Sequence, residues 1–336
     1  MLLSELPSRN NPALPLARLQ ITLVACEDIV DLPPFRGAFW RGVFGRALAA
    51  LSDESLPLAE VWPESIATVS FGKWRRAELY RMLFAPEDET ATLPAHLQVP
   101  APFVIDALPG ESHLREGETE MIGLTLIGNA AVHALPAVLA AFERAGRDGL
   151  GGASADGHRG RARLVDASLT WREAGSATPV LSHEGTVALV EAAAPPVPPM
   201  PEEVTVTLAS PLRLLKRGQL IGPDDFRPGD LLEALVRRIS TLQRCHGPGP
   251  IAADFRALFD RAAQARMADR DLWFAEQHRW SGHQKQEIEM GGLVGTFRLP
   301  LGDLGALWPY LWLGQWVHAG KGTVHGMGSV RLGRSA

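Results

Sequence analysis

Apolar and polar residues in the first part of the chain follow two different periods. Arg18 to Ala25 alternates apolar with polar side chains, which predicts a half-buried strand. Arg36 to Leu51 predicts a helix, because its apolar residues recur every four positions: Phe39, Val43, Ala47 and Leu51. Further strands are predicted around Ile66 to Phe71, Val99 to Ile105, Glu118 to Ile127 and Arg161 to Trp171, with a helix near Val132 to Ala145. The order is compatible with β-α-β-β-α-β.

The last third of the chain gives a similar order. Val204 to Leu208 alternates apolar residues with threonine, and Asp230 to Cys245 carries Leu231, Leu235, Ile239 and Leu242 on one helical face. A second helix is predicted near Ala252 to Met267, strands near Asp271 to Trp280 and Gly292 to Leu299, a helix near Leu304 to Leu313 and a strand from Val324 to Leu332. This is β-α-β-β-α-β with one helix inserted.

A proline-rich segment separates the two patterns. Residues 191–201, EAAAPPVPPMP, hold five prolines and predict an extended connector. We therefore expect an N-terminal domain at 1–190, a linker at 191–201 and a C-terminal domain at 202–336. The repeated order predicts an α+β protein with two tandem ferredoxin-like (RRM-like) domains, the second with an inserted helix.

Composition limits the class of protein. The 336 residues are 46% hydrophobic and 21% charged, as in a soluble globular protein. Cys26 and Cys245 form no metal-binding or disulfide pattern, and no secretion signal or membrane span is read from the sequence. We expect a cytoplasmic protein that holds no metal and no cofactor. The net charge of −5 gives no support to a nucleic-acid partner, so local basic patches must carry that hypothesis.

The glycine-rich segment His318 to Gly328, HAGKGTVHGMG, is the first candidate site. Gly320, Gly322, Gly326 and Gly328 could adopt positive φ and present backbone N–H groups to a phosphate. A nucleotide-triphosphate loop fits poorly, because Gly322 stands where a serine or threonine should bind magnesium. A glycine-rich turn leading into a last strand is the competing interpretation.

Basic side chains elsewhere form further candidate phosphate contacts. Arg159, Arg161 and Arg163 would lie on one side of a strand, where they make a row of phosphate contacts or a solvated edge. Arg36 and Arg41 lie on the first predicted helix together with Arg46. The three are spaced five residues apart, so they cannot all share one face of the helix. Arg279, His283 and Lys285 surround a predicted hairpin tip, which could contact a phosphate backbone or could equally be a solvated hairpin.

Four segments resemble CRISPR-associated repeat-processing endoribonucleases of the RAMP superfamily. They are Leu32 to Leu48, Leu79 to Ile105, Leu124 to Leu164 and, most specifically, Arg279 to Leu332 with RWSGHQKQEIEMGGLVGTFRL and LWLGQWVHAGKGTVHGMGSVRL. The resemblance implies a pair of ferredoxin-like domains that hold the stem-loop of a CRISPR repeat. In active members of the family, it also implies metal-independent cleavage at the base of the stem.

Cleavage of this kind requires a base for the ribose 2′-hydroxyl, an acid for the departing 5′-oxygen and a cation, and it leaves a 2′,3′-cyclic phosphate. His318 and His325 are the candidate acid and base, with Lys321 as the cation; each histidine has a competing interpretation, His318 as an interior residue and His325 as a solvent-facing one. This chain departs from the family pattern, because no histidine precedes His96 where many members carry a catalytic one.

Three hypotheses follow from the resemblance. The chain is an endoribonuclease that matures CRISPR RNA, a non-catalytic subunit that holds the guide RNA in an effector complex, or a structural RAMP protein that packs against protein partners. The expected partners are CRISPR repeat RNA and other subunits of an effector complex, with the chain itself a monomer or a homodimer. The missing histidine favours the second hypothesis over the first.

Overall fold

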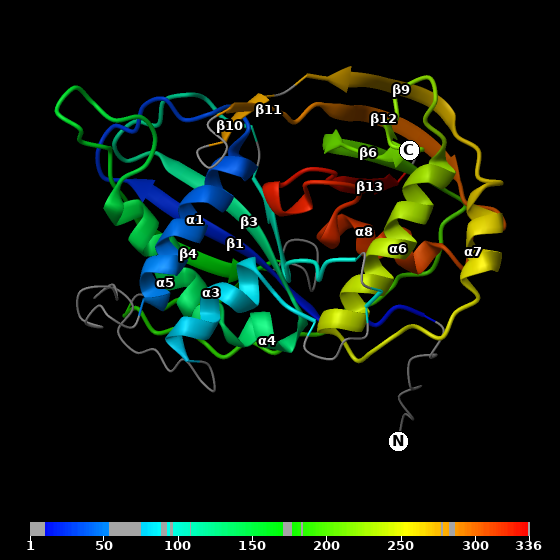
Figure 1. Cartoon of the computed structure of the whole chain (residues 1–336), viewed down its shortest axis with the longest axis horizontal. Helices are drawn as coiled ribbons and strands as arrows, with labels where there is room; N and C mark the ends of the chain where they lie inside the picture. The colour runs from blue at the N-terminus through cyan, green and yellow to red at the C-terminus, as the bar shows by residue number, and fades with distance from the viewer. Residues whose placement is uncertain are drawn as a thin grey trace. The chain divides into compact units, whose positions relative to one another are not determined.

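The chain divides into two compact units in the computed structural model (Figure 1). The model describes residues 11–53, 75–88, 93–94, 97–107, 109–170, 177–182, 184–276, 278–281 and 286–334. Residues 15–193 form what we call the N-terminal unit; residues 194–336, together with the segment before Pro15, form the C-terminal unit. The boundary between the two units, between Ala193 and Ala194, lies within the proline-rich segment at residues 191–201.

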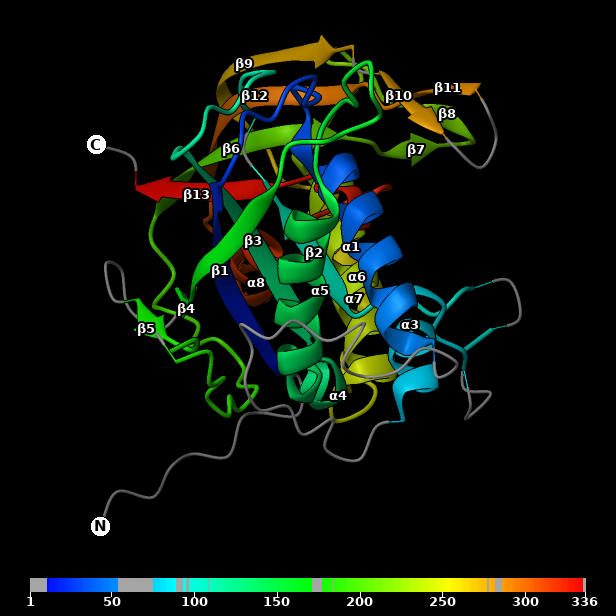
Figure 2. The same ribbon diagram turned by 90° about the vertical axis from the view of Figure 1, so that its left-hand side faces the viewer.

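The N-terminal unit is an antiparallel sheet with helices on one face (Figure 2). Its strands lie in the order β2-β3-β1-β4-β5, and their bounds are β1 Leu16–Ala25, β2 Phe103–Asp106, β3 Thr119–Ile127, β4 Ala162–Leu169 and β5 Thr178–Pro179. The helices are α1 Arg36–Ser52, α3 Arg76–Phe84, α4 Gly128–His133 and α5 Leu135–Asp148.

Aromatic packing joins α1 to α5 in the core of this unit. The rings of Phe44 and Phe142 stack with centroids 5.0 Å apart, and Phe103 and Phe84 approach Phe44 from the sides. Both stacked rings are fully buried, and burying one ring of this size contributes about 2 kcal/mol. Of the four residues whose spacing predicts this helix, Val43, Ala47 and Leu51 are buried, whereas Phe39 is only partly buried.

The C-terminal unit contains a second antiparallel sheet, ordered β13-β6-β12-β9. The strands are β6 Glu203–Leu212, β9 Ala268–Ala275, β12 Gly292–Pro300 and β13 Val330–Arg334; the helices are α6 Pro228–His246, α7 Phe255–Ala262 and α8 Trp308–Val317, followed by the short 3-10 helix η1 Thr323–His325. Two hairpins extend from it, β7 Leu215–Lys216 with β8 Gln219–Leu220, and β10 His278–Ser281 with β11 Gln286–Glu289.

Each sheet has the strand order of a ferredoxin-like fold. Numbered within its own unit, each order reads 2-3-1-4 from one edge, with one helical connection after the first strand and one after the third. The second unit carries α7 as an additional helix between β6 and β9. The predicted α+β architecture with tandem ferredoxin-like domains is confirmed, including the inserted helix.

Several predicted boundaries are wrong: the strand predicted from Val99 begins at Phe103, and the helix predicted to end near Met267 ends at Ala262. The strand predicted at Val324 to Leu332 begins only at Val330, because Gly326 and Gly328 adopt φ of 78° and 68° and turn the chain first. The strand predicted at Asp271 to Trp280 is two strands, β9 and β10, and the helix predicted at Leu304 begins at Trp308. The strand predicted at Ile66 to Phe71 lies outside the described residues.

The proline-rich segment is held against α8. The indole N–H of Trp308 donates to the carbonyl of Pro198 at 2.7 Å, and that of Trp312 donates to Pro196 at 3.0 Å. The apolar character of α8 thus serves packing inside the unit. Within the part of the chain that the structure describes, no helix combines the length and apolar character that crossing a membrane requires.

Candidate nucleic-acid interface

The glycine-rich segment after α8 folds as a tight loop that only glycine allows. Gly320, Gly322, Gly326 and Gly328 all have positive φ, between 68° and 79°. A Cβ on Gly328 would lie 1.8 Å from the Ala319 carbonyl oxygen, and one on Gly320 would lie 2.4 Å from that of Arg213. Gly320 and Gly328 are therefore required by close backbone approach as well as by φ.

Several N–H groups of this loop are used inside the fold. Gly328 donates to the Pro211 carbonyl at 3.0 Å, Gly326 to that of Thr323 at 3.0 Å, and Lys321 to that of Arg213 at 3.0 Å. The N–H groups of Gly320 and Gly322 make no backbone hydrogen bond within the described residues. A phosphate cradle could thus use Gly320 and Gly322, whereas the N–H groups of Gly326 and Gly328 are not available for it.

The three candidate catalytic residues of the loop lie in different environments. His318 ends α8 with φ of 59°, has no exposed surface, and its Nδ1 lies 3.1 Å from the Met327 carbonyl oxygen. His325 is half-buried on η1, and Lys321 is exposed. A histidine without exposed surface cannot meet RNA unless the loop opens, so this position favours the interior interpretation of His318.

A buried arginine fixes the start of the loop. The Nε of Arg238 on α6 donates to the Val317 carbonyl at the end of α8, at 2.6 Å. Burial lowers the pKa of Arg238 to about 10, so the guanidinium stays charged at neutral pH and complements the negative end of the α8 dipole.

The two arginines predicted on α1 are engaged within the N-terminal unit. Arg36 is 2% exposed; its Nε lies 3.1 Å from the Glu120 carboxylate, and its other nitrogens donate to the Pro33 and Glu111 carbonyls. Arg41 lies with its guanidinium 5.3 Å from the centre of the Phe84 ring. Arg36 has the contacts of a structural residue that ties loops to α1.

Arg159, Arg161 and Arg163 alternate with buried residues and are all exposed. Arg159 donates to the Gly151 carbonyl, and Arg161 is ion-paired with Glu27 at 2.6 Å. Arg163 makes no ion pair with any residue that the structure describes. β4 itself begins at Ala162, so only Arg163 lies within the strand.

Glu27 lies at the centre of a charged network that sequence reasoning missed. Its carboxylate accepts hydrogen bonds from the His158 Nε2 at 2.8 Å, from the Arg161 backbone N–H at 3.1 Å, and from the Arg161 Nε and Nη2 at 3.0 and 2.6 Å. These donors, the Arg161 side chain foremost, lower the pKa of Glu27 to about 2.

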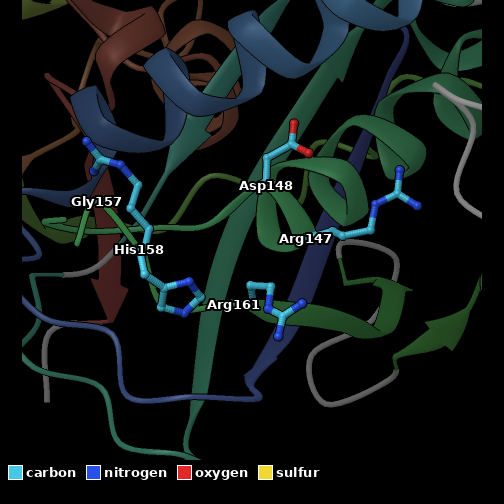
Figure 3. A pocket seen from close by; sticks show the side chains of 6 residues that line it. Arg147, Asp148, Gly157, His158 and Arg161 are labelled. Carbon is cyan, nitrogen blue, oxygen red and sulfur yellow. The ribbon is translucent and has the colours of Figure 1, made fainter. Parts of the chain in front are cut away.

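The same network borders a pocket of about 530 Å³ in the N-terminal unit (Figure 3). Its lining consists of Arg147, Asp148, Gly157, His158, Arg159 and Arg161. In Figure 3 the His158 ring and the Arg161 guanidinium lie next to each other, while Arg147 and Asp148 come from the end of α5. The one sequence signal for this pocket is the basic run HRGRAR that begins at His158.

The stabilisation of residues 158–161 by their hydrogen bonds to Glu27 is expected to depend on pH. Because folding lowers the pKa of Glu27 from 4.5 to about 2, its contribution is fully present above pH 4.5 and is lost as the pH falls from 4.5 toward 2. Amide hydrogen exchange of residues 150–161, corrected for intrinsic rates, should rise over that range. In Glu27→Gln it should already be fast at neutral pH and show no such acid step; an identical step in the variant would contradict the assignment.

The predicted hairpin is present, but its tip is not described. β10 pairs with β11 from His278 opposite Glu289 to Ser281 opposite Gln286. Arg279 lies on β10, opposite Ile288. His283 and Lys285 lie outside the described residues, so their part in RNA binding stays a prediction.

Comparison with protein-family models gives two matches that together cover most of the chain. A family described as an N-terminal domain, AF_1859_N, matches residues 14–193, and the family "CRISPR-associated endoribonuclease Cas6" matches residues 206–330. No protein of curated function matches the sequence.

Solved structures with the same fold include Cas6 proteins. Thermus thermophilus Cas6 (TTHB231) is 19% identical over 95% of this chain and 99% of that chain, with a TM-score of 0.52; its product complex gives 0.55 at the same identity and coverage. A chain of a partial Cas6-RT-Cas1–Cas2 complex gives 0.58 at 14% identity, over 98% of this chain and 47% of that chain. At these identities, the likeness supports the shared fold. The chain thus has two ferredoxin-like units and the fold of the solved Cas6 structures, and its second unit is similar in sequence to the CRISPR-associated endoribonuclease Cas6 family over residues 206–330.

Proposed function

We propose that this protein matures CRISPR RNA by binding the repeat stem-loop of the precursor and cutting it without a metal ion, through attack of a ribose 2′-hydroxyl that leaves a 2′,3′-cyclic phosphate. The observation that supports this proposal most directly is the Cas6 match over residues 206–330. This range contains the glycine-rich loop with its exposed Lys321. An RNA helix is recognised by shape and phosphate contacts, because its deep groove hides the bases. Lys321 and the N–H groups of Gly320 and Gly322 supply such contacts.

The proposed partners are CRISPR repeat RNA and other Cas proteins. The TTHB231 structure with the same fold is described as a product complex, and another such structure is described as a Cas6-RT-Cas1–Cas2 complex. We place the protein in the cytoplasm, where Cys26 and Cys245 would stay reduced; both are free thiols in the structure.

A non-catalytic subunit that holds the guide RNA is the second candidate function. The buried position of His318 favours it, because one of the two proposed proton-transfer groups in the glycine-rich loop has no exposed surface. In this alternative the protein binds the repeat with the same residues and releases no product.

A gel assay of the purified protein with its labelled native repeat in EDTA separates these functions. Cleavage to a product with a cyclic phosphate end supports the endoribonuclease, and tight binding without cleavage supports the holding subunit. His318→Ala and His325→Ala variants that still bind test the loop as the catalytic site. Absence of both binding and cleavage in the native protein would remove CRISPR RNA as the partner.

Lys321→Ala is expected to weaken repeat binding about fivefold at low salt and to reduce the slope of log K against log salt by about one, because one phosphate contact is lost. Filter binding over a salt series measures both quantities. Lys216→Ala is the matched control: Lys216 is exposed in the same unit but is already paired with Asp230 at 3.0 Å. Equal effects of the two substitutions would contradict a specific role for Lys321.

A further inference from the structure

Three loops meet at one end of the N-terminal sheet and are joined by backbone hydrogen bonds. The segment after β1, residues 26–32, is hydrogen-bonded to Ser112 and Leu114 on one side and to Gly152 and Arg161 on the other. The bonds include Cys26 N–H to the Arg161 carbonyl, Ile29 and Leu114 to each other, and Gly152 N–H to the Val30 carbonyl, each 2.8 Å long. Side chains in this cluster are therefore presented by backbone that the sheet holds in place.

We propose that His158 is a catalytic base of RNA cleavage and that Glu27 is its positioning residue; this inference rests on the proposed function. The His158 Nε2 lies 2.8 Å from the Glu27 carboxylate, and the side chains are 52% and 29% exposed. Because an ionised carboxylate can only accept, the Nε2 carries the hydrogen, and the Nδ1 lone pair is left to take a proton. His158 thus has the access to solvent that His318 lacks.

The pocket beside His158 has the cations that a reacting phosphate requires. Arg161 uses its Nε and Nη2 on Glu27, which leaves its Nη1 without a hydrogen bond among the described residues. Arg147 is exposed and makes no ion pair within the part of the chain that is described. Two guanidinium groups beside one imidazole can hold a phosphate by charge-assisted hydrogen bonds.

Two carboxylates of the pocket region are already paired. Asp148 lies 3.1 Å from the Arg144 Nε, and the Asp156 carboxylate accepts from the Ser154 hydroxyl at 2.5 Å and from the His158 N–H at 3.2 Å. Together with Glu27 they contribute three negative charges. The four arginines of this region contribute four positive charges: Arg144, Arg147, Arg159 and Arg161. The balance stays positive, so the pocket favours a phosphodiester.

The reaction at this site is a transesterification. The His158 Nδ1 takes the proton of a ribose 2′-hydroxyl, and the 2′-oxygen forms a bond to the adjacent phosphorus. The bond from phosphorus to the 5′-oxygen breaks, and the 5′-oxygen leaves with the electron pair and takes a proton from water. Arg147 and Arg161 stabilise the negative charge of the five-coordinate phosphorus, and the imidazolium returns its proton to solvent.

The test is single-turnover cleavage of the labelled native repeat in EDTA by His158→Ala and His158→Gln. Each should cleave at least about a hundredfold more slowly than the native protein, the scale of general base catalysis. Each should bind a repeat with a deoxyribose before the cut, which cannot react, within about twofold of the native protein. Added imidazole should restore part of the rate to His158→Ala, which a purely structural role would not produce.

Glu27→Gln should slow cleavage by about tenfold or more, and by a smaller factor in the His158→Ala background, because Glu27 acts through the His158 ring and also holds the Arg161 side chain. His113→Ala is the matched control. His113 lies in the same loop cluster and also pairs with a carboxylate, Asp28 at 3.5 Å, but it does not line the pocket. His113→Ala should cleave at the native rate.

Native-rate cleavage by both His158 variants would overturn the assignment and move the base elsewhere. A native protein that binds the repeat without cutting it would also overturn this inference, and would leave the holding subunit as its function. Failure of the native protein to bind any repeat would instead contradict the proposed function itself.

Discussion

Gly328→Ala is expected to destabilise the C-terminal unit by about 3–5 kcal/mol, because a methyl group at this position has no space. The new Cβ would lie 1.8 Å from the Ala319 carbonyl oxygen and 2.9 Å from its carbonyl carbon, and both atoms belong to backbone that cannot rotate away. The Ala319 N–H in turn donates to the Gly328 carbonyl at 2.9 Å, so any shift of one residue breaks the hydrogen bond to the other. Urea unfolding followed by tryptophan fluorescence measures the loss.

Gly218→Ala is the control that measures the cost of the left-handed backbone conformation without the steric clash expected at Gly328. Gly218 has φ of 83°, in the same left-handed region as Gly328, but a Cβ there would meet nothing within 4 Å. This variant should lose only about 1 kcal/mol, the cost of holding an L-residue in that conformation. If the two variants were equally stable, the tight contact between Gly328 and Ala319 could not be the cause.

Arg36→Met should destabilise the N-terminal unit by about 3–5 kcal/mol, because it leaves a carboxylate unpaired in a largely buried position. Glu120 is 14% exposed, and the oxygen that accepts from Arg36 also accepts from the Trp40 indole at 3.1 Å. Two loop carbonyls, those of Pro33 and Glu111, lose their donors as well. Urea unfolding monitored by circular dichroism gives the change in free energy.

Arg81→Met is the control for loss of an arginine at the surface. Arg81 pairs with Glu87 at 3.0 Å, but the side chains are 66% and 70% exposed, so the pair contributes only about 0–1 kcal/mol. The double variant Arg36→Met, Glu120→Gln should recover part of the loss, since it removes the stranded charge. A loss in Arg36→Met no larger than in Arg81→Met would contradict the structural role of Arg36.

The order of elements could be predicted because local patterns determine it. Alternation in β1 and the four-residue spacing in α1 reflect burial on one side of each element. The start of β13 could not be placed in this way, because Val324 and His325 alternate in polarity like a strand while the glycines around them turn the backbone. Polarity alone contains no information about φ.

The candidate site was predicted in part. Lys321 and His325 were recognised as neighbours in one glycine-rich loop, but the burial of His318 depends on how α8 packs. Glu27 and His158 are 131 residues apart in sequence, and they meet only because β4 pairs with β1 in a register that aligns Ala162 with Ala25. Long-range pairing of this kind is set by the whole sheet, so no local motif could reveal it.

The backbone of Leu16 is hydrogen-bonded to that of Ala193 in both directions, at 3.0 and 3.2 Å. The N-terminal unit therefore begins and ends at the same place, while Ala13, just before it, is hydrogen-bonded to Gln243 of the C-terminal unit at 2.8 Å. In covalent terms, the first ferredoxin-like domain is an insert carried by the second. Circular permutation and domain insertion both require chain ends that lie close together. Residues 15–193 meet this requirement, so we expect this unit to tolerate insertion into another protein or new termini in one of its loops.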